Sequence, residues 1–125
     1  MDDQSLDIKN VLDKLIDLLK SSDPYQIILF GSHATGHPNE HSDIDLVVIL
    51  DNDHVSKTYQ ERLDKRLRIR KSVREVNRKV ALDLLVYSKE EWRIVREYGN
   101  PFINEIEETG KVIYEKNRPE RTQCL

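Results

Sequence analysis

Residues 25–50 read YQIILFGSHATGHPNEHSDIDLVVIL, two apolar runs joined by a loop rich in glycine and polar side chains. The first run ends at Gly31, as a buried strand does when it opens into a tight turn. Two glycines and a proline make regular structure unfavourable in the loop that follows, residues 31–42. Asp43 then begins the second apolar run, 44–50. The stretch predicts two buried strands separated by an irregular loop.

The flanking sequence predicts helices in alternation with strands. In chain order we expect a helix over 6–19, a long charged helix over 55–77, a strand over 80–87, a helix after the Ser88–Glu91 capping box, a helix from Asn100 to Gly110 and a short strand over 112–114. This order predicts an α/β fold, a small mixed β-sheet with helices packed on it. We expect a single domain over 1–115 and a flexible C-terminal tail over 116–125.

Composition narrows the class of protein. The formal net charge of −3 over 125 residues argues against a protein that coats nucleic acid, so no stable nucleic-acid partner is expected. No apolar run approaches the length of a membrane span, and the acidic start, residues 1–3, lacks the basic region of a signal peptide. The single cysteine, Cys124, fits a reducing compartment, and we expect a cytoplasmic protein with no membrane partner.

Three aspartates form the candidate metal site. Asp43 and Asp45 are one residue apart at a strand start, so both carboxylates leave the same face, about 7 Å apart at the backbone. Hard oxygen ligands of this kind suit Mg²⁺ or Mn²⁺. If their strand neighbours the strand over 80–87, Asp83 joins them around two ions about 4 Å apart. An alternative for Asp83 is a strand-end acid paired with a nearby arginine.

A candidate anion site precedes these aspartates. Gly31 and Ser32 directly follow a predicted strand, so free backbone N–H groups and a hydroxyl can face a triphosphate. Glycine also lets a ligand approach the backbone closely. A phosphate site followed by a carboxylate pair and a third carboxylate is the order expected for metal-dependent nucleotide transfer.

The segments 31–36, GSHATG, and 42–46, SDIDL, together resemble the signature of the DNA polymerase β-like nucleotidyltransferase superfamily. The closest resemblance is to its minimal nucleotidyltransferase branch, and it implies a fold like the palm of polymerase β. Asp83, within LDLLV at 82–86, matches the third aspartate of that family.

The resemblance also implies roles. Gly31 and Ser32 would hold the triphosphate of ATP, Asp43 and Asp45 would bridge two Mg²⁺ ions, and Asp83 would bind the ion that activates the attacking hydroxyl. Short members of the branch pair with helical HEPN-type proteins as toxin–antitoxin systems, and some transfer AMP to a tyrosine of that partner. The resemblance therefore implies a protein adenylyltransferase that acts as an antitoxin in a hetero-oligomer.

Two other functions stay open. The chain could be a binding subunit that neutralises its partner by occlusion, without catalysis. It could also transfer nucleotides to a small molecule such as an antibiotic, although the larger relatives that do so carry an additional domain for the acceptor, and this chain has none.

Three further patterns need interpretation. His33, His37 and His41 would face a zinc ion if their segment were helical, but Gly36 and Pro38 argue against that helix, so solvated loop histidines are expected, one of them touching phosphate. A set of larger apolar side chains is expected in the core or in part at a partner interface: Trp92, Val95, Tyr98, Phe102 and Ile106.

Five arginines recur at four-residue steps along the long charged helix and its end: Arg62, Arg66, Arg70, Arg74 and Arg78. At about 100° per residue, Lys65 falls on the opposite side from this arginine ridge, which shares its sector with four other residues: Tyr59, Leu63, Leu67 and Val73. Either the arginine stems cover the edge of the core with their charged ends in water, or part of the ridge faces the triphosphate or an acidic partner surface.

Overall fold

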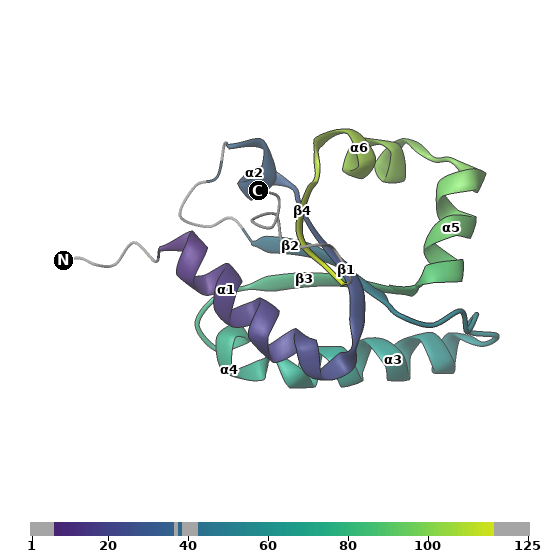
Figure 1. The fold of residues 1–125 in the computed structure, drawn as a ribbon, viewed down its shortest axis with the longest axis horizontal. Coiled ribbons are helices and arrows are strands. Elements are labelled where there is room, and N and C mark those ends of the chain that lie inside the picture. The colour runs from purple at the N-terminus through teal and green to yellow at the C-terminus, as the bar shows by residue number, and fades with distance from the viewer. Residues whose placement is uncertain (1–6, 37, 39–42, 117–125) are drawn as a thin grey trace, which may run out of the picture.

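The computed structural model describes residues 7–36, 38 and 43–116. A four-stranded sheet runs through it in the order β3-β2-β1-β4 (Figure 1). The strands are β1 Pro24–Phe30, β2 Ile44–Leu50, β3 Leu82–Ser88 and β4 Lys111–Glu115. Strand β1 is antiparallel to β2 and β4, whereas β2 and β3 are parallel. The predicted small mixed sheet is therefore confirmed.

Helices cover both faces of this sheet. Their bounds are α1 Ile8–Leu19, the short 3-10 helix η1 Lys20–Ser22, α2 Ser32–Thr35, α3 Tyr59–Ser72, α4 Arg74–Asn77, α5 Lys89–Tyr98 and α6 Pro101–Thr109. Helices α1, α3 and α4 lie against one face, and α5 and α6 lie over the other (Figure 1). The sheet is thus the middle of three layers.

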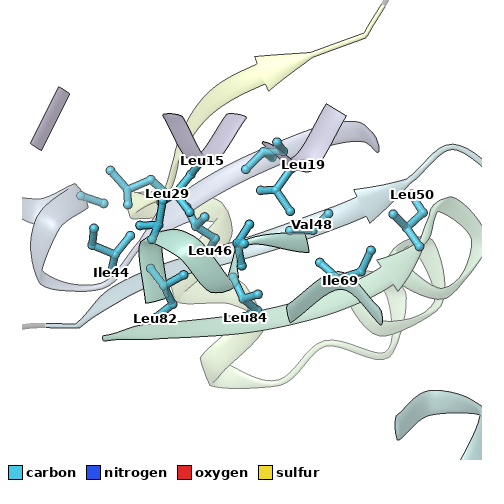
Figure 2. Close-up of a cluster of buried hydrophobic side chains, with 14 residues drawn as sticks. Leu15, Leu19, Leu29, Ile44, Leu46, Val48, Leu50, Ile69, Leu82 and Leu84 are labelled. Atoms are coloured by element: carbon cyan, nitrogen blue, oxygen red, sulfur yellow. The ribbon is translucent and has the colours of Figure 1, made fainter. Parts of the chain in front are cut away.

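The core has two halves because β2 is buried on both sides. Leu46 and Val48 point toward α1 and α3, where Leu15 and Ile69 meet them (Figure 2). The residues between them on β2 point the other way, into a second cluster of buried side chains: Ile28, Phe30, Val47, Ile49, Trp92, Ile103 and Ile106. A strand with two buried faces needs a continuous apolar run, which is why 44–50 was recognisable as a strand.

Two predictions about regular structure were wrong. The loop over 31–42 contains one helical turn, α2, which ends at Gly36 with φ +84°. The helix expected over 55–77 begins only after Thr58, whose hydroxyl accepts a hydrogen bond from the Glu61 N–H at 3.1 Å. It is then interrupted at the buried Val73, whose φ of −111° and ψ of 16° are not helical.

The buried face of α3 also differs from the predicted one. Lys65 and Ile69 are its buried residues, whereas Tyr59 and Leu67 are exposed. The Lys65 ammonium donates a hydrogen bond to the Glu91 carboxylate of α5. A hydrophobic pattern assigns every lysine to the solvent-facing side of a helix, even one that is buried with its ion-pair partner. The prediction therefore placed the wrong face of α3 against the core.

Residues 88–115 follow the prediction closely. Ser88 and Glu91 form the expected capping box, and Asn100 caps α6, with Gly110 at its C-terminus. Lys116, the first residue of the predicted tail, donates hydrogen bonds to Asp23 and Asp51 at 2.6 and 2.7 Å. The remaining predicted tail, 117–125, lies outside the described residues, and the domain bounds stay a prediction.

Within the described ranges, none of the helices combines the length and the apolar character needed to cross a membrane.

Candidate active site

The strand register places two of the predicted carboxylates side by side. Strand β3 lies parallel and next to β2, and Asp45 is the register partner of Asp83. Asp45 alternates with the residues of β2 that face α1 and α3, so it belongs to the face covered by α5 and α6. Asp43 directly precedes β2 and is exposed. The expectation that these two strands are neighbours is confirmed.

Gly31 makes room for one of these carboxylates. A Cβ atom on Gly31 would lie 2.1 Å from Oδ2 of Asp45, far inside van der Waals contact. The glycine also has φ +76° and ψ −158°, a conformation that side-chain-bearing residues rarely adopt. Sequence reasoning assigned the glycine to ligand approach, and the structure adds that the protein's own Asp45 needs the space.

Charge is concentrated at this point. Burial raises the pKa of Asp45 most, the carboxylates of Asp83 and Asp43 raise it further, and His33 opposes them. A carboxylate whose ionised form is disfavoured by neighbouring carboxylates is stabilised by a cation between them. The hard oxygen donors and their mutual repulsion therefore fit a divalent ion. Within 7–36, 38 and 43–116, no group of three acidic, histidine or cysteine side chains is already close enough to hold one.

The predicted anion site forms the start of α2. The N–H groups of Ala34 and Thr35 donate to the carbonyl of Gly31 at 3.0 and 3.1 Å. In the described part of the chain, the N–H groups of Ser32 and His33 have no protein acceptor. They belong to the first turn of the helix, directly beside Gly31.

The histidine pattern is only partly visible. His33 is half-buried on α2. His37 and His41, like Ser42 of the family motif, lie outside the described residues.

A cavity of about 260 Å³ opens beside the two paired carboxylates. The sheet contributes Phe30, Gly31, Asp45 and Asp83, and α6 contributes Phe102, Glu105, Ile106 and Thr109. Sequence reasoning placed no member of α6 at the site, because nothing in the chain order shows that this helix borders the end of β1 and the start of β2. The one available signal was the set of apolar side chains. Trp92 and Ile106 of that set are buried, whereas Tyr98 and Phe102 are exposed.

The arginine ridge reaches the edge of the site. Nη2 of Arg66 lies 3.9 Å from Oδ1 of Asp83, and both side chains are about half exposed. The alternative of an arginine partner for Asp83 is therefore present as a long, solvated contact, which is weak compared with coordination of a divalent ion. It stays a prediction that part of the arginine ridge faces a triphosphate or an acidic partner surface.

Comparison with solved structures shows the same fold. A candidate nucleotidyltransferase from Sulfolobus solfataricus superposes with a TM-score of 0.55 and 16% identity, over 87% of this chain and 81% of that one. A chain of a toxin–antitoxin crystallised with AMP-PNP gives a TM-score of 0.52 and 20% identity, over 84% and 73%. No curated protein matches the sequence significantly.

The sequence model named "Polymerase beta, Nucleotidyltransferase" matches residues 13–119, which is most of the chain and includes Gly31, Asp45 and Asp83. The chain belongs to the polymerase beta nucleotidyltransferase family.

Proposed function

We propose that this chain transfers AMP from ATP to a hydroxyl group in a reaction that depends on divalent metal. The observation that carries the proposal is the register pairing of Asp45 with Asp83 beside Gly31, whose missing side chain admits the Asp45 carboxylate. Burial and the carboxylates of Asp83 and Asp43 raise the pKa of Asp45, which lies beside Gly31. Together with the N–H groups of Ser32 and His33, which have no acceptor in the described part of the chain, these carboxylates suit a triphosphate bound with metal.

In this proposal the chain's own groups divide the work by position. Asp43 and Asp45 hold Mg²⁺, or Mn²⁺, against the phosphates, and Asp83 joins them from the neighbouring strand. Gly31 and Ser32 receive the triphosphate, and the N–H groups available to it in the described part of the chain are those of Ser32 and His33. When bound, two Mg²⁺ ions neutralise phosphate charge and favour ionisation of the attacking hydroxyl.

The acceptor approaches from the open edge of the sheet. Strand β3 is an edge strand, and the Asp83 side chain is about half exposed there, so a hydroxyl can reach it from solvent. The acceptor oxygen forms a bond to the α-phosphorus, the bond from that phosphorus to the bridging oxygen breaks, and pyrophosphate leaves. No covalent intermediate with the enzyme is needed.

We further propose that the acceptor is a tyrosine of a helical HEPN-type toxin and that the modification neutralises it. The resemblance of the GSHATG and SDIDL motifs to the minimal branch of the family supports this. The shared fold with a chain from a toxin–antitoxin crystallised with AMP-PNP is consistent with it. The product of the neighbouring gene is the first acceptor to test.

Labelled ATP tests the reaction class. The chain and its candidate partner are incubated with Mg²⁺ and ATP labelled either at the α- or at the γ-phosphate. Label on the partner is expected only from α-labelled ATP and is expected to disappear in the Asp43→Asn, Asp45→Asn double variant. Transfer of γ-label would show phosphoryl transfer instead. Full neutralisation by a double variant that still binds the partner would favour occlusion without chemistry.

A further inference from the structure

Helix α6 forms the wall of the cavity that faces the carboxylates, yet the proposed function uses none of its side chains. Phe102, Glu105 and Thr109 of α6 line the same cavity as Asp45 and Asp83. The helix is firmly attached, because Ile103 and Ile106 are buried in the core. The wall is therefore a fixed surface and not a loose segment.

Phe102 is unusual in this wall because it is large and apolar but 51% exposed. Its ring contacts the ring of Phe30 edge to face, with centroids 5.9 Å apart and an interplanar angle of 81°. Phe30 is itself buried and directly precedes Gly31. An aromatic ring that is held on one side and borders a cavity on another offers its remaining surface to a flat apolar ligand.

The charged groups that line the cavity favour one orientation of a bound nucleotide. The end near Gly31 holds the carboxylates of Asp45 and Asp83, which would bind the divalent metal that accompanies a triphosphate, and the N–H groups of Ser32 and His33, which have no acceptor in the described part of the chain. The α6 wall carries the Glu105 carboxylate, whose side chain makes no ion pair or hydrogen bond within the described part of the chain. Phosphate oxygens are repelled by this carboxylate. A bound nucleotide therefore turns its phosphates toward α2 and its uncharged end toward α6.

We propose that the ring of Phe102 is the platform on which the nucleobase of the nucleoside triphosphate stacks. This inference rests on the proposed function, because it takes the triphosphate to lie at Gly31. Stacking on an aromatic side chain is tolerant of base identity, since every base has a π-face. Stacking on Phe102 by itself therefore does not select one base.

Two ligands, one with a nucleobase and one without, distinguish the contribution of the base to binding from that of the phosphates. A non-hydrolysable ATP analogue and inorganic tripolyphosphate, each with Mg²⁺, are titrated calorimetrically into the full chain. Phe102→Ala is expected to weaken binding of the ATP analogue about 5- to 150-fold, the range for loss of one base stack, and to leave tripolyphosphate binding unchanged. Phe102→Trp keeps an aromatic ring and is expected to retain ATP binding, which controls for folding.

Tyr98→Ala is the matched control, because Tyr98 is an exposed aromatic residue that does not line the cavity. It is expected to bind both ligands as the wild type does. Equal binding of the ATP analogue by Phe102→Ala and the wild type would overturn this inference alone. A wild-type chain that binds neither ligand would overturn the proposed function, and this inference with it.

Discussion

Replacing Gly31 with alanine is expected to lower the stability of the fold slightly and to weaken nucleotide binding strongly. The added Cβ would lie 2.1 Å from Oδ2 of Asp45, which is the far end of a side chain that can rotate away. The loss in free energy of unfolding therefore comes mainly from the strain of placing alanine in a glycine-only backbone conformation, of order 1–3 kcal/mol. The site loses the position of Asp45. The loss of one contact to a charged group, about 1.5–3 kcal/mol, corresponds to about 10- to 150-fold weaker binding of ATP with Mg²⁺.

Gly36→Ala is the matched control for this experiment. Gly36 also has positive φ, +84°, but an added Cβ would meet no atom within 4 Å. Left-handed backbone costs about 1–2 kcal/mol, so urea unfolding is expected to show a similar loss of stability in both variants. Calorimetric titration with an ATP analogue is expected to show weak binding only for Gly31→Ala. Wild-type affinity in Gly31→Ala, or an equal loss in Gly36→Ala, would refute the reasoning.

Two further predictions concern charge. Glu91→Gln leaves the Lys65 ammonium buried without an anionic partner and is expected to cost about 3–5 kcal/mol in urea unfolding. Glu90→Gln weakens a pair with the half-exposed Arg93 and is expected to cost far less, because solvent screens that pair. Burial opposes ionisation of Glu91, but hydrogen bonds from Lys65, Ser56 and Ser88 outweigh burial and lower the pKa of Glu91. The ionised Glu91 therefore contributes its full stabilisation of the fold above pH 4.5, its ordinary pKa, and this stabilisation is lost as the pH falls below that value. A difference between wild type and Glu91→Gln that does not shrink at acidic pH would contradict this. Asp45→Asn removes a carboxylate that Asp83 and Asp43 repel, so without metal the variant is expected to unfold at a higher temperature than the wild type. Added Mg²⁺ is expected to raise the unfolding temperature of the wild type only. A variant that unfolds at a lower temperature than the wild type without metal would argue against this repulsion.

The parts of the fold that the sequence predicted well are those that depend on neighbouring residues in the chain. The run 44–50 is apolar except for Asp45 because β2 is buried on both faces. The caps at Ser88 and Asn100 act within three residues. The pairing of Asp83 with Asp45 follows once β3 lies next to β2, whereas the placement of Asp43 on the same face stays a prediction.

The parts that the sequence could not predict depend on distant contacts. Lys65 is buried because Glu91, in another helix, supplies its counter-charge. A hydrophobic pattern counts a lysine as solvent-facing, so α3 was rotated in the prediction. The wall formed by Phe102 and Glu105 depends on where α6 crosses the sheet, and no local pattern sets that position.

The central claim is that divalent metal and nucleotide bind between Asp45 and Asp83, and paramagnetic broadening by Mn²⁺ tests it most directly. Backbone amide spectra are recorded with a non-hydrolysable ATP analogue while Mn²⁺ is added in small steps. The signals of Asp45, Asp83 and Gly31 are expected to disappear first. Broadening centred on Asp23 and Asp51, the acidic pair at the opposite end of the sheet, with sharp signals at Asp45 and Asp83, would contradict it.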